Sequence, residues 1–111
     1  MGKASILSIV ATDCPAENDA KFNKWYNEVH IPLLFKFKGI KRVCRYKLMG
    51  ENKDLPKYLA LYEYENKEDL EANSRSPEFA AAMQEMQETW KDGGFDIKWA
   101  ASYEPIKTWE R

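Results

Sequence analysis

Hydrophobic and polar positions recur along the chain with two different periods, which predict the segments that form strands and those that form helices. Residues 4–12 are apolar at most positions: Ile6 and Val10 lie on one face of an extended chain, and Leu7 and Ile9 on the other. A strand that is apolar on both faces is typically covered on both sides. We therefore predict a first strand here, with neither face left in water.

Three further segments have the composition of strands. Residues 40–48 are rich in β-branched and aromatic side chains, with Arg42 interrupting an apolar face, and residues 58–64 are mostly apolar on both faces. A last strand covers residues 97–109, where Pro105 bends it, ends it or places it at an edge. One face of these segments carries, in turn, Ile40, Cys44, Tyr46 and Leu48; Tyr58, Ala60, Tyr62 and Tyr64; and Trp99, Ala101 and Tyr103. The pattern leaves open which face of each strand meets the helices.

A first helix is predicted to end at about His30, which lies at the edge of an apolar stripe with spacings of three or four residues. Pro32 cannot donate a backbone hydrogen bond and disfavours a helical Ile31, so we expect the helix to break or kink just after His30. The stripe consists of Phe22, Trp25, Tyr26, Val29 and Leu33. Several residues before the helix are possible turn or cap residues, and the sequence does not choose among them: Asp13, Pro15 and Asn18.

The second half of the chain predicts two helices with clear boundaries. Asn66 is a cap for a short helix, and Ser76 followed by Pro77 marks the start of a longer one. The glycines in residues 92–94 end the longer helix. Its apolar face consists of Phe79, Met83, Met86 and Trp90.

The predicted order of elements is β-α-β-β-α-β, which is the ferredoxin-like arrangement of the α+β class. A four-stranded antiparallel sheet then carries its helices on one face. Because the strands are apolar on both sides, the uncovered face is an interaction surface. We expect a second copy of the chain to cover it, sheet against sheet, in a two-fold homodimer.

Composition and charge narrow the class of protein. A chain of 111 residues with 44% hydrophobic residues suits a single domain, residues 1–111, with a real core. The net charge of −1, without a basic block, argues against nucleic-acid binding. Two widely separated cysteines form no disulfide framework, and no run reaches the roughly 20 apolar residues of a membrane span. These features predict a cytoplasmic protein that is not bound to a membrane.

Three motifs resemble the ethyl tert-butyl ether degradation (EthD) family of the dimeric α/β-barrel superfamily. The strand GIKRVCRY covers residues 39–46, and the strand YLALYE covers residues 58–63. The helix has the form F-x-x-W-Y-x-x-x-H-x-P-x-L, here Phe22, Trp25, Tyr26, His30, Pro32 and Leu34. The resemblance implies a homodimer and a pocket between helices and sheet in each subunit. Its wider superfamily includes cofactor-free monooxygenases, muconolactone isomerases, polyketide cyclases and haem-binding enzymes.

His30 is the leading candidate for chemistry, because it is the only histidine and its ordinary pKa lies near neutrality. Tyr26 is the second predicted catalytic residue, as a group that orients a substrate oxygen. The alternative for His30 is a core histidine whose nitrogens are satisfied by the protein. A helix C-terminus at this point is expected to favour the charged form of the imidazole. Further candidates for binding a flat organic ligand are Tyr46, Tyr62, Trp99 and Arg42. Each has a structural alternative as well, packing for the aromatic residues and a solvated strand edge for Arg42.

The predicted function is therefore the binding of a small apolar or aromatic molecule, with cofactor-independent acid–base chemistry at His30. Isomerase, cyclase, dehydratase and monooxygenase reactions would all suit such a site. A non-catalytic carrier or sensor is the alternative, and haem ligation by His30 is a third possibility. No metal site is predicted, because one histidine and two distant cysteines match no ligand spacing, and no cofactor motif is present.

Overall fold

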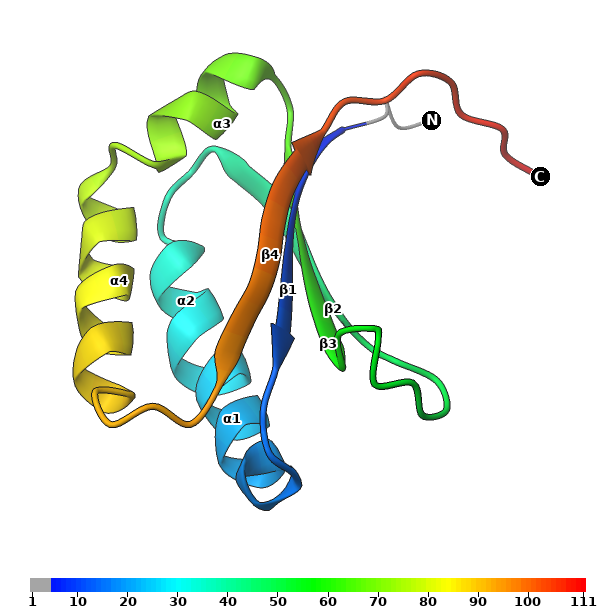
Figure 1. Cartoon of the computed structure of the whole chain (residues 1–111). Coiled ribbons are helices and arrows are strands. Elements are labelled where there is room, and N and C mark those ends of the chain that lie inside the picture. Colours follow the sequence, from blue (N-terminus) through cyan, green and yellow to red (C-terminus); the bar gives the residue numbers. More distant parts are fainter. Residues whose placement is uncertain (1–4) are drawn as a thin grey trace.

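The computed structural model of the protein describes residues 5–111. The predicted α+β, ferredoxin-like order of elements is confirmed, with extra helical turns (Figure 1). The elements are β1 (Ile6–Asp13), the 3-10 turn η1 (Ala16–Asn18), α1 (Asp19–Trp25), the π-helix η2 (Tyr26–His30), α2 (Ile31–Leu34), β2 (Ile40–Lys47), β3 (Tyr58–Tyr64), α3 (Lys67–Asn73), α4 (Pro77–Thr89) and β4 (Asp96–Tyr103).

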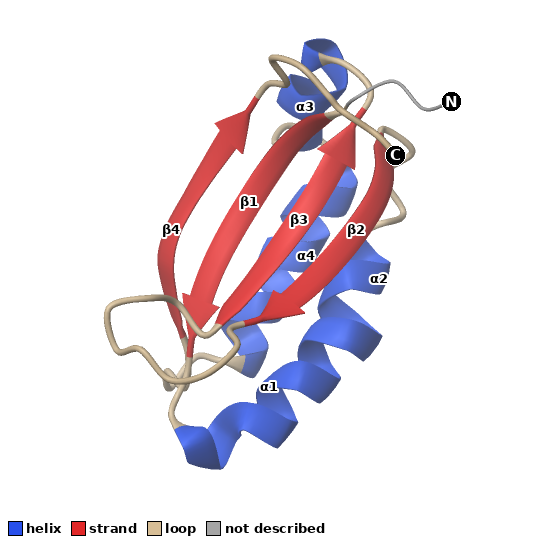
Figure 2. Cartoon of the chain, turned by 90° about the vertical axis from the view of Figure 1, so that its right-hand side faces the viewer, coloured by secondary structure: helices blue, strands red, loops and turns tan. Residues whose placement is uncertain are grey.

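The four strands form one antiparallel sheet in the order β2-β3-β1-β4. Figure 2 shows the helices behind this sheet, so that all helices of the described chain lie on one of its faces. We call the other side the open face. Its residues, by strand register, are Arg42, Cys44 and Tyr46 of β2; Leu59, Leu61 and Glu63 of β3; Leu7, Ile9 and Ala11 of β1; and Trp99, Ala101 and Tyr103 of β4.

Strand β3 follows the predicted alternation along its whole length. All four residues of its aromatic face are buried against the helices, namely Tyr58, Ala60, Tyr62 and Tyr64. These side chains, together with Phe22 and Trp25 of α1, make up much of the core. The sequence pattern left open which face of β3 meets the helices. The structure shows that it is the aromatic face.

Two irregularities in strand pairing change which residues share a face. In β2 the register shifts between Ile40, which pairs with Tyr64, and Arg42, which pairs with Glu63. Ile40 is therefore buried under the helices, whereas Arg42 lies on the open face. The predicted common face of Ile40, Cys44, Tyr46 and Leu48 is wrong, because an extra residue in a strand reverses the alternation beyond it. The pairing of β4 with β1 shifts in a similar way between Ile97 and Trp99, so these two residues do not share a face.

The predicted helix boundaries in the second half of the chain are confirmed. The Asn66 side chain accepts a hydrogen bond from the backbone N–H of Asp69 at 2.8 Å, and Ser76 Oγ accepts one from Phe79 at 3.0 Å. Past the end of α4, Gly93 and Gly94 have φ values of 85° and 128°, which favour glycine.

Of the two predicted responses to Pro32, a break or a kink after His30, the break is wrong. Ile31 is helical, with φ −63° and ψ −44°, and its N–H donates to the carbonyl of Tyr26, five residues earlier. A π-helix therefore carries the chain from α1 into α2, and Pro32 lies in the first turn of α2. A π turn shifts the helical hydrogen-bond register by one residue. Pro32 then falls in the first turn of α2, where a residue without a backbone N–H is tolerated.

Candidate functional site

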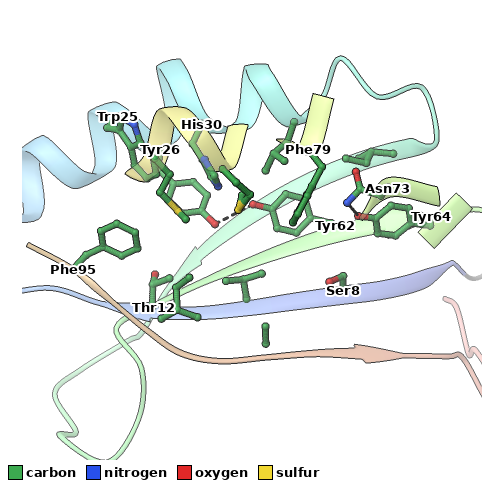
Figure 3. A pocket seen from close by; sticks show the side chains of 17 residues that line it. Ser8, Thr12, Trp25, Tyr26, His30, Tyr62, Tyr64, Asn73, Phe79 and Phe95 are labelled. Carbon is green, nitrogen blue, oxygen red and sulfur yellow. Dashed lines mark hydrogen bonds between the residues drawn. The ribbon is translucent and has the colours of Figure 1, made fainter. Parts of the chain in front are cut away.

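A cavity of about 290 Å³ lies between the helices and the inner face of the sheet (Figure 3). Its walls come from η2, α4 and the inner faces of β1 and β3, and most of its lining side chains are apolar or aromatic. Ligand pockets in proteins range from about 300 to 1,000 Å³. This cavity therefore has room for one small molecule and offers it few polar contacts.

His30 points from the π-helix toward this cavity and is only 5% exposed. Its ring stacks on Trp25, with centroids 4.6 Å apart, and meets the ring of Tyr26 edge-on at 4.9 Å. Nδ1 of His30 is buried and has no hydrogen-bond partner among residues 5–111. Buried polar atoms in native proteins are nearly all paired, so an unpaired one is typical of a site completed by a ligand or water.

The electrostatic environment of His30 favours the neutral imidazole. Burial lowers the pKa of His30 from 6.5 to about 4; Glu85 opposes this effect, and Arg45 adds to it. The expectation that the helix terminus would favour the charged form is wrong, because loss of hydration outweighs the nearby charges. At neutral pH the ring is thus a proton acceptor that carries no charge.

Tyr26 and Tyr62 form the polar centre of the cavity. Their hydroxyl oxygens are 3.0 Å apart in a buried hydrogen bond, in which either can be the donor. Burial raises the pKa of Tyr26 and raises that of Tyr62 further, so both phenols keep their hydrogens at neutral pH. One of the two hydrogens is used between the rings, and the second remains able to donate to a ligand oxygen.

Helix α4 holds the indole ring of Trp25, which stacks on His30. The indole N–H of Trp25 donates to Glu85 Oε1 at 2.9 Å, and Thr89 also donates to the Glu85 carboxylate. The sequence assigned Trp25 only to the core, and it does pack there, but it is also the platform for the imidazole. Glu85 itself gave no signal in the sequence, because the contact joins two helices 60 residues apart.

Arg45 is a second charged residue that the sequence did not single out. It lies on the inner side of β2, its guanidinium carbon is 4.4 Å from the centre of the Tyr26 ring, and it donates to Asn27 Oδ1 at 2.9 Å. A cation over an aromatic face is held by the charge distribution of the ring. Arg45 therefore supports Tyr26 from the side of β2.

The structure brings three of the predicted site residues together and separates the other three. His30, Tyr26 and Tyr62 line the cavity. Arg42, Tyr46 and Trp99 lie on the open face, so the expectation that they line the same pocket does not hold. Arg42 Nε instead forms an ion pair with Glu63 at 2.9 Å.

The cavity also takes in residues that the sequence did not propose for a site: Ser8, Thr12, Tyr64, Asn73, Phe79, Met83 and Met86. Of these, only Tyr64 had a usable signal, since it shares its strand face with Tyr62.

The described residues contain neither a metal-binding cluster nor a membrane-spanning helix. Across residues 5–111 no cluster of three histidine, cysteine or acidic side chains is arranged to hold a metal ion. Within the same residues no helix has the length and apolar character needed to cross a membrane.

Residues 5–97 match the model of a protein family described as a domain of unknown function (DUF4286). The chain belongs to this family. No curated protein matches the sequence. The site described above is therefore a cavity in a DUF4286 domain, whose family description names no activity.

Solved structures share the fold of this DUF4286 domain. An EthD family protein from Bacillus halodurans has a TM-score of 0.68 at 16% identity, with 91% of this chain and 99% of that chain covered. HapK from Hahella chejuensis has a TM-score of 0.71 at 10% identity, with coverage of 96% and 97%. A dimeric protein of unknown function and ferredoxin-like fold from Bacteroides fragilis has a TM-score of 0.66 at 18% identity, covering 94% and 99%. The resemblance to the EthD family is thus confirmed for the fold. Sequence identities this low do not show that the proteins share a reaction.

Proposed function

We propose that the protein binds a small ring-containing molecule with a carbonyl or phenolic oxygen, and that His30 accepts a proton from it. The observation that carries this proposal is a neutral, buried imidazole beside a pair of protonated phenols in an apolar cavity. A base with a low pKa is weak in water, but it acts on an acidic C–H or O–H held at the right distance.

The hydrogens on the two tyrosines and on the ligand decide which residue donates and which accepts. The Tyr26–Tyr62 pair has one phenolic hydrogen to donate to a ligand oxygen, which stabilises charge that develops on that oxygen. In a ketone, a proton on the neighbouring carbon would pass to His30 while the electron pair of the C–H bond moves toward the oxygen. Returning the proton to another atom completes an isomerisation. In a cyclisation the enolate carbon attacks a second carbonyl carbon of the ligand, the electron pair of that C=O bond moves to its oxygen, and this oxygen takes the proton back from His30. Both reactions balance without a cofactor.

A non-catalytic carrier or sensor is the second candidate, and the apolar lining of the cavity favours it. In that case the ligand would bind to the same phenol pair and leave unchanged. The two candidates differ in one measurement, which is whether an incubated ligand is recovered as itself or as a product.

We also propose that the open face forms the interface of a two-fold homodimer. Tyr46, Trp99 and Tyr103 are 52%, 42% and 53% exposed on this face, which is more aromatic surface than a monomer usually leaves in water. The related structures from Bacteroides fragilis and from an uncultured marine organism are described as dimeric. Both cysteines are free, which suits the reducing cytoplasm that the sequence predicts.

The test begins with native mass spectrometry of the purified protein, and any small molecule that it identifies is then supplied to ligand-free protein. We expect His30→Ala to abolish turnover and Tyr62→Phe to lower it by about 100- to 1,000-fold, the usual loss when one hydrogen-bond donor to a developing charge is removed. Circular dichroism and light scattering would show that both variants fold and assemble as the wild type does. Full turnover by His30→Ala would overturn the acid–base role, and unchanged ligand in all samples would favour the carrier.

A further inference from the structure

A second polar pair lies in the cavity wall, at the end away from Trp25 (Figure 3). Tyr64 follows Tyr62 on the inner face of β3, and Asn73 is the last residue of α3. Nδ2 of Asn73 donates to the Tyr64 hydroxyl at 3.0 Å, and both side chains line the cavity. We call these two residues the distal pair.

The distal pair does not use all of its hydrogen-bonding groups. Oδ1 of Asn73 is buried and has no partner among the described residues, although a buried amide oxygen normally accepts a hydrogen bond. The Tyr64 oxygen acts as the acceptor in its bond with Asn73, so its own hydrogen is not used in that bond. Burial raises the pKa of Tyr64 to about 12, which keeps this hydrogen in place at neutral pH.

The pair therefore offers one donor and one acceptor side by side. We propose that the distal pair is a subsite for a neutral group that both accepts and donates a hydrogen bond, such as a hydroxyl or an amide, on the far end of the ligand. This inference rests on the proposed function, which places a ligand oxygen at the Tyr26–Tyr62 pair. A carboxylate is disfavoured there, because it would lose its hydration and meet the lone pairs of the Asn73 oxygen.

The strand sets the spacing of the two tyrosines, whose side chains leave the same face of β3. Tyr62 and Tyr64 are two residues apart on one face of β3, so their Cα atoms are separated by about 7 Å. That length corresponds to one aromatic ring with substituents at opposite positions. Phe79 of α4 also lines the cavity and gives the ring of the ligand an aromatic neighbour. The substrate class is thus an aromatic ketone with a neutral polar group para to the ketone.

Calorimetry with three matched probes tests this inference on the full chain. The probes are para-hydroxyacetophenone, para-methylacetophenone, which is nearly the same size, and para-acetylbenzoate, which carries a negative charge. For the wild type we expect the hydroxyl compound to bind about tenfold tighter than the methyl compound, the usual effect of satisfying a buried polar group, and the anion to bind weakest.

The variants separate the two ends of the cavity. Tyr64→Phe and Asn73→Leu should each bring the ratio of the two neutral affinities close to one. The control Tyr62→Phe should weaken both ketones by a similar factor and leave the ratio unchanged. Equal binding of both neutral probes by the wild type would overturn the distal subsite and leave the proposed function standing. Failure of the wild type to bind any of the three probes would count against the proposed function itself, and the inference would fall with it.

Discussion

The imidazole of His30 lies against the indole of Trp25, with the two ring planes inclined by only 24°. Trp25 is in turn held by its hydrogen bond to Glu85 of α4, so a residue on one helix sets the position of the candidate base on another. The His30 imidazole is therefore shielded from water. The charge of Glu85 also raises the pKa of His30, although no hydrogen bond joins the two side chains.

The pH dependence of folding stability should report the buried His30. Burial lowers its pKa in the folded protein to about 4, whereas the unfolded chain has a pKa of about 6.5. Between these values the unfolded state binds more protons, so stability falls as the pH drops. The contribution is present above about pH 6.5 and is lost as the pH falls through 4, and the total amounts to about 3 kcal/mol.

Urea denaturation of the wild type and of His30→Gln at pH 7 and pH 5 checks this contribution, because glutamine does not titrate. The wild type should lose more stability than the variant over this interval. The single histidine also gives an unambiguous imidazole signal in NMR titration. A midpoint near 6.5 in the folded protein would contradict the buried, neutral imidazole.

Glu85→Gln should lower the pKa of His30 further. The amide still accepts the hydrogen bond of Trp25, but the negative charge that opposes the effect of burial is gone. Glu85→Leu removes the acceptor as well, and we expect it to destabilise the fold by about 1–3 kcal/mol because the indole N–H is left unpaired. NMR titration and urea denaturation measure the two effects. Glu88→Gln on the exposed side of α4 is the control, and an equal His30 pKa in both glutamine variants would argue against the coupling.

Asp19→Asn should destabilise the protein without affecting the cavity. One oxygen of Asp19 accepts hydrogen bonds from Lys57 Nζ and from the Tyr58 hydroxyl, each at 2.9 Å, and from Cys14 Sγ at 3.3 Å. The bond from Lys57 is the main reason that the pKa of Asp19 is lowered, so its contribution is present at neutral pH and is lost as the pH falls below the ordinary aspartate range.

We expect a loss of about 1 kcal/mol at pH 7, a modest value because the Asp19–Lys57 pair is partly exposed to solvent. Thermal and urea denaturation measure it, with Asp54→Asn in the exposed β2–β3 loop as the matched control. The NMR titration of His30 should be the same in both variants. Equal stability of the two variants would show that the Asp19 cluster contributes nothing.

Trp99→Lys should weaken the proposed homodimer at least tenfold, since a charge would replace a half-exposed aromatic residue of the open face. Light scattering across a micromolar concentration range measures the assembly. Phe35→Lys is the control, because Phe35 is similarly exposed but follows α2 on the helical side of the sheet. A wild-type protein that is monomeric over this range would contradict the dimer.

Much of the fold could be predicted because its signals are local. The caps at Asn66 and Ser76 satisfy backbone groups three residues away, and the aromatic face of β3 alternates with the period of a strand. The pairing of His30 with Tyr26 is also local, since both belong to one helical turn. By contrast, the response of the chain to Pro32 required a choice between a break and a π turn, which depends on the packing of the whole helix.

The sequence by itself determined the order of elements, the starts of the helices after Asn66 and Ser76, and the leading candidate residue, because these depend on contacts within a few positions of the chain. Only the tertiary structure decided that Arg42, Tyr46 and Trp99 face away from His30, and that Tyr26 meets Tyr62 while Trp25 meets Glu85. The physical reason is that one extra residue in a strand reverses every face beyond it, and register is fixed by partners far away in the sequence.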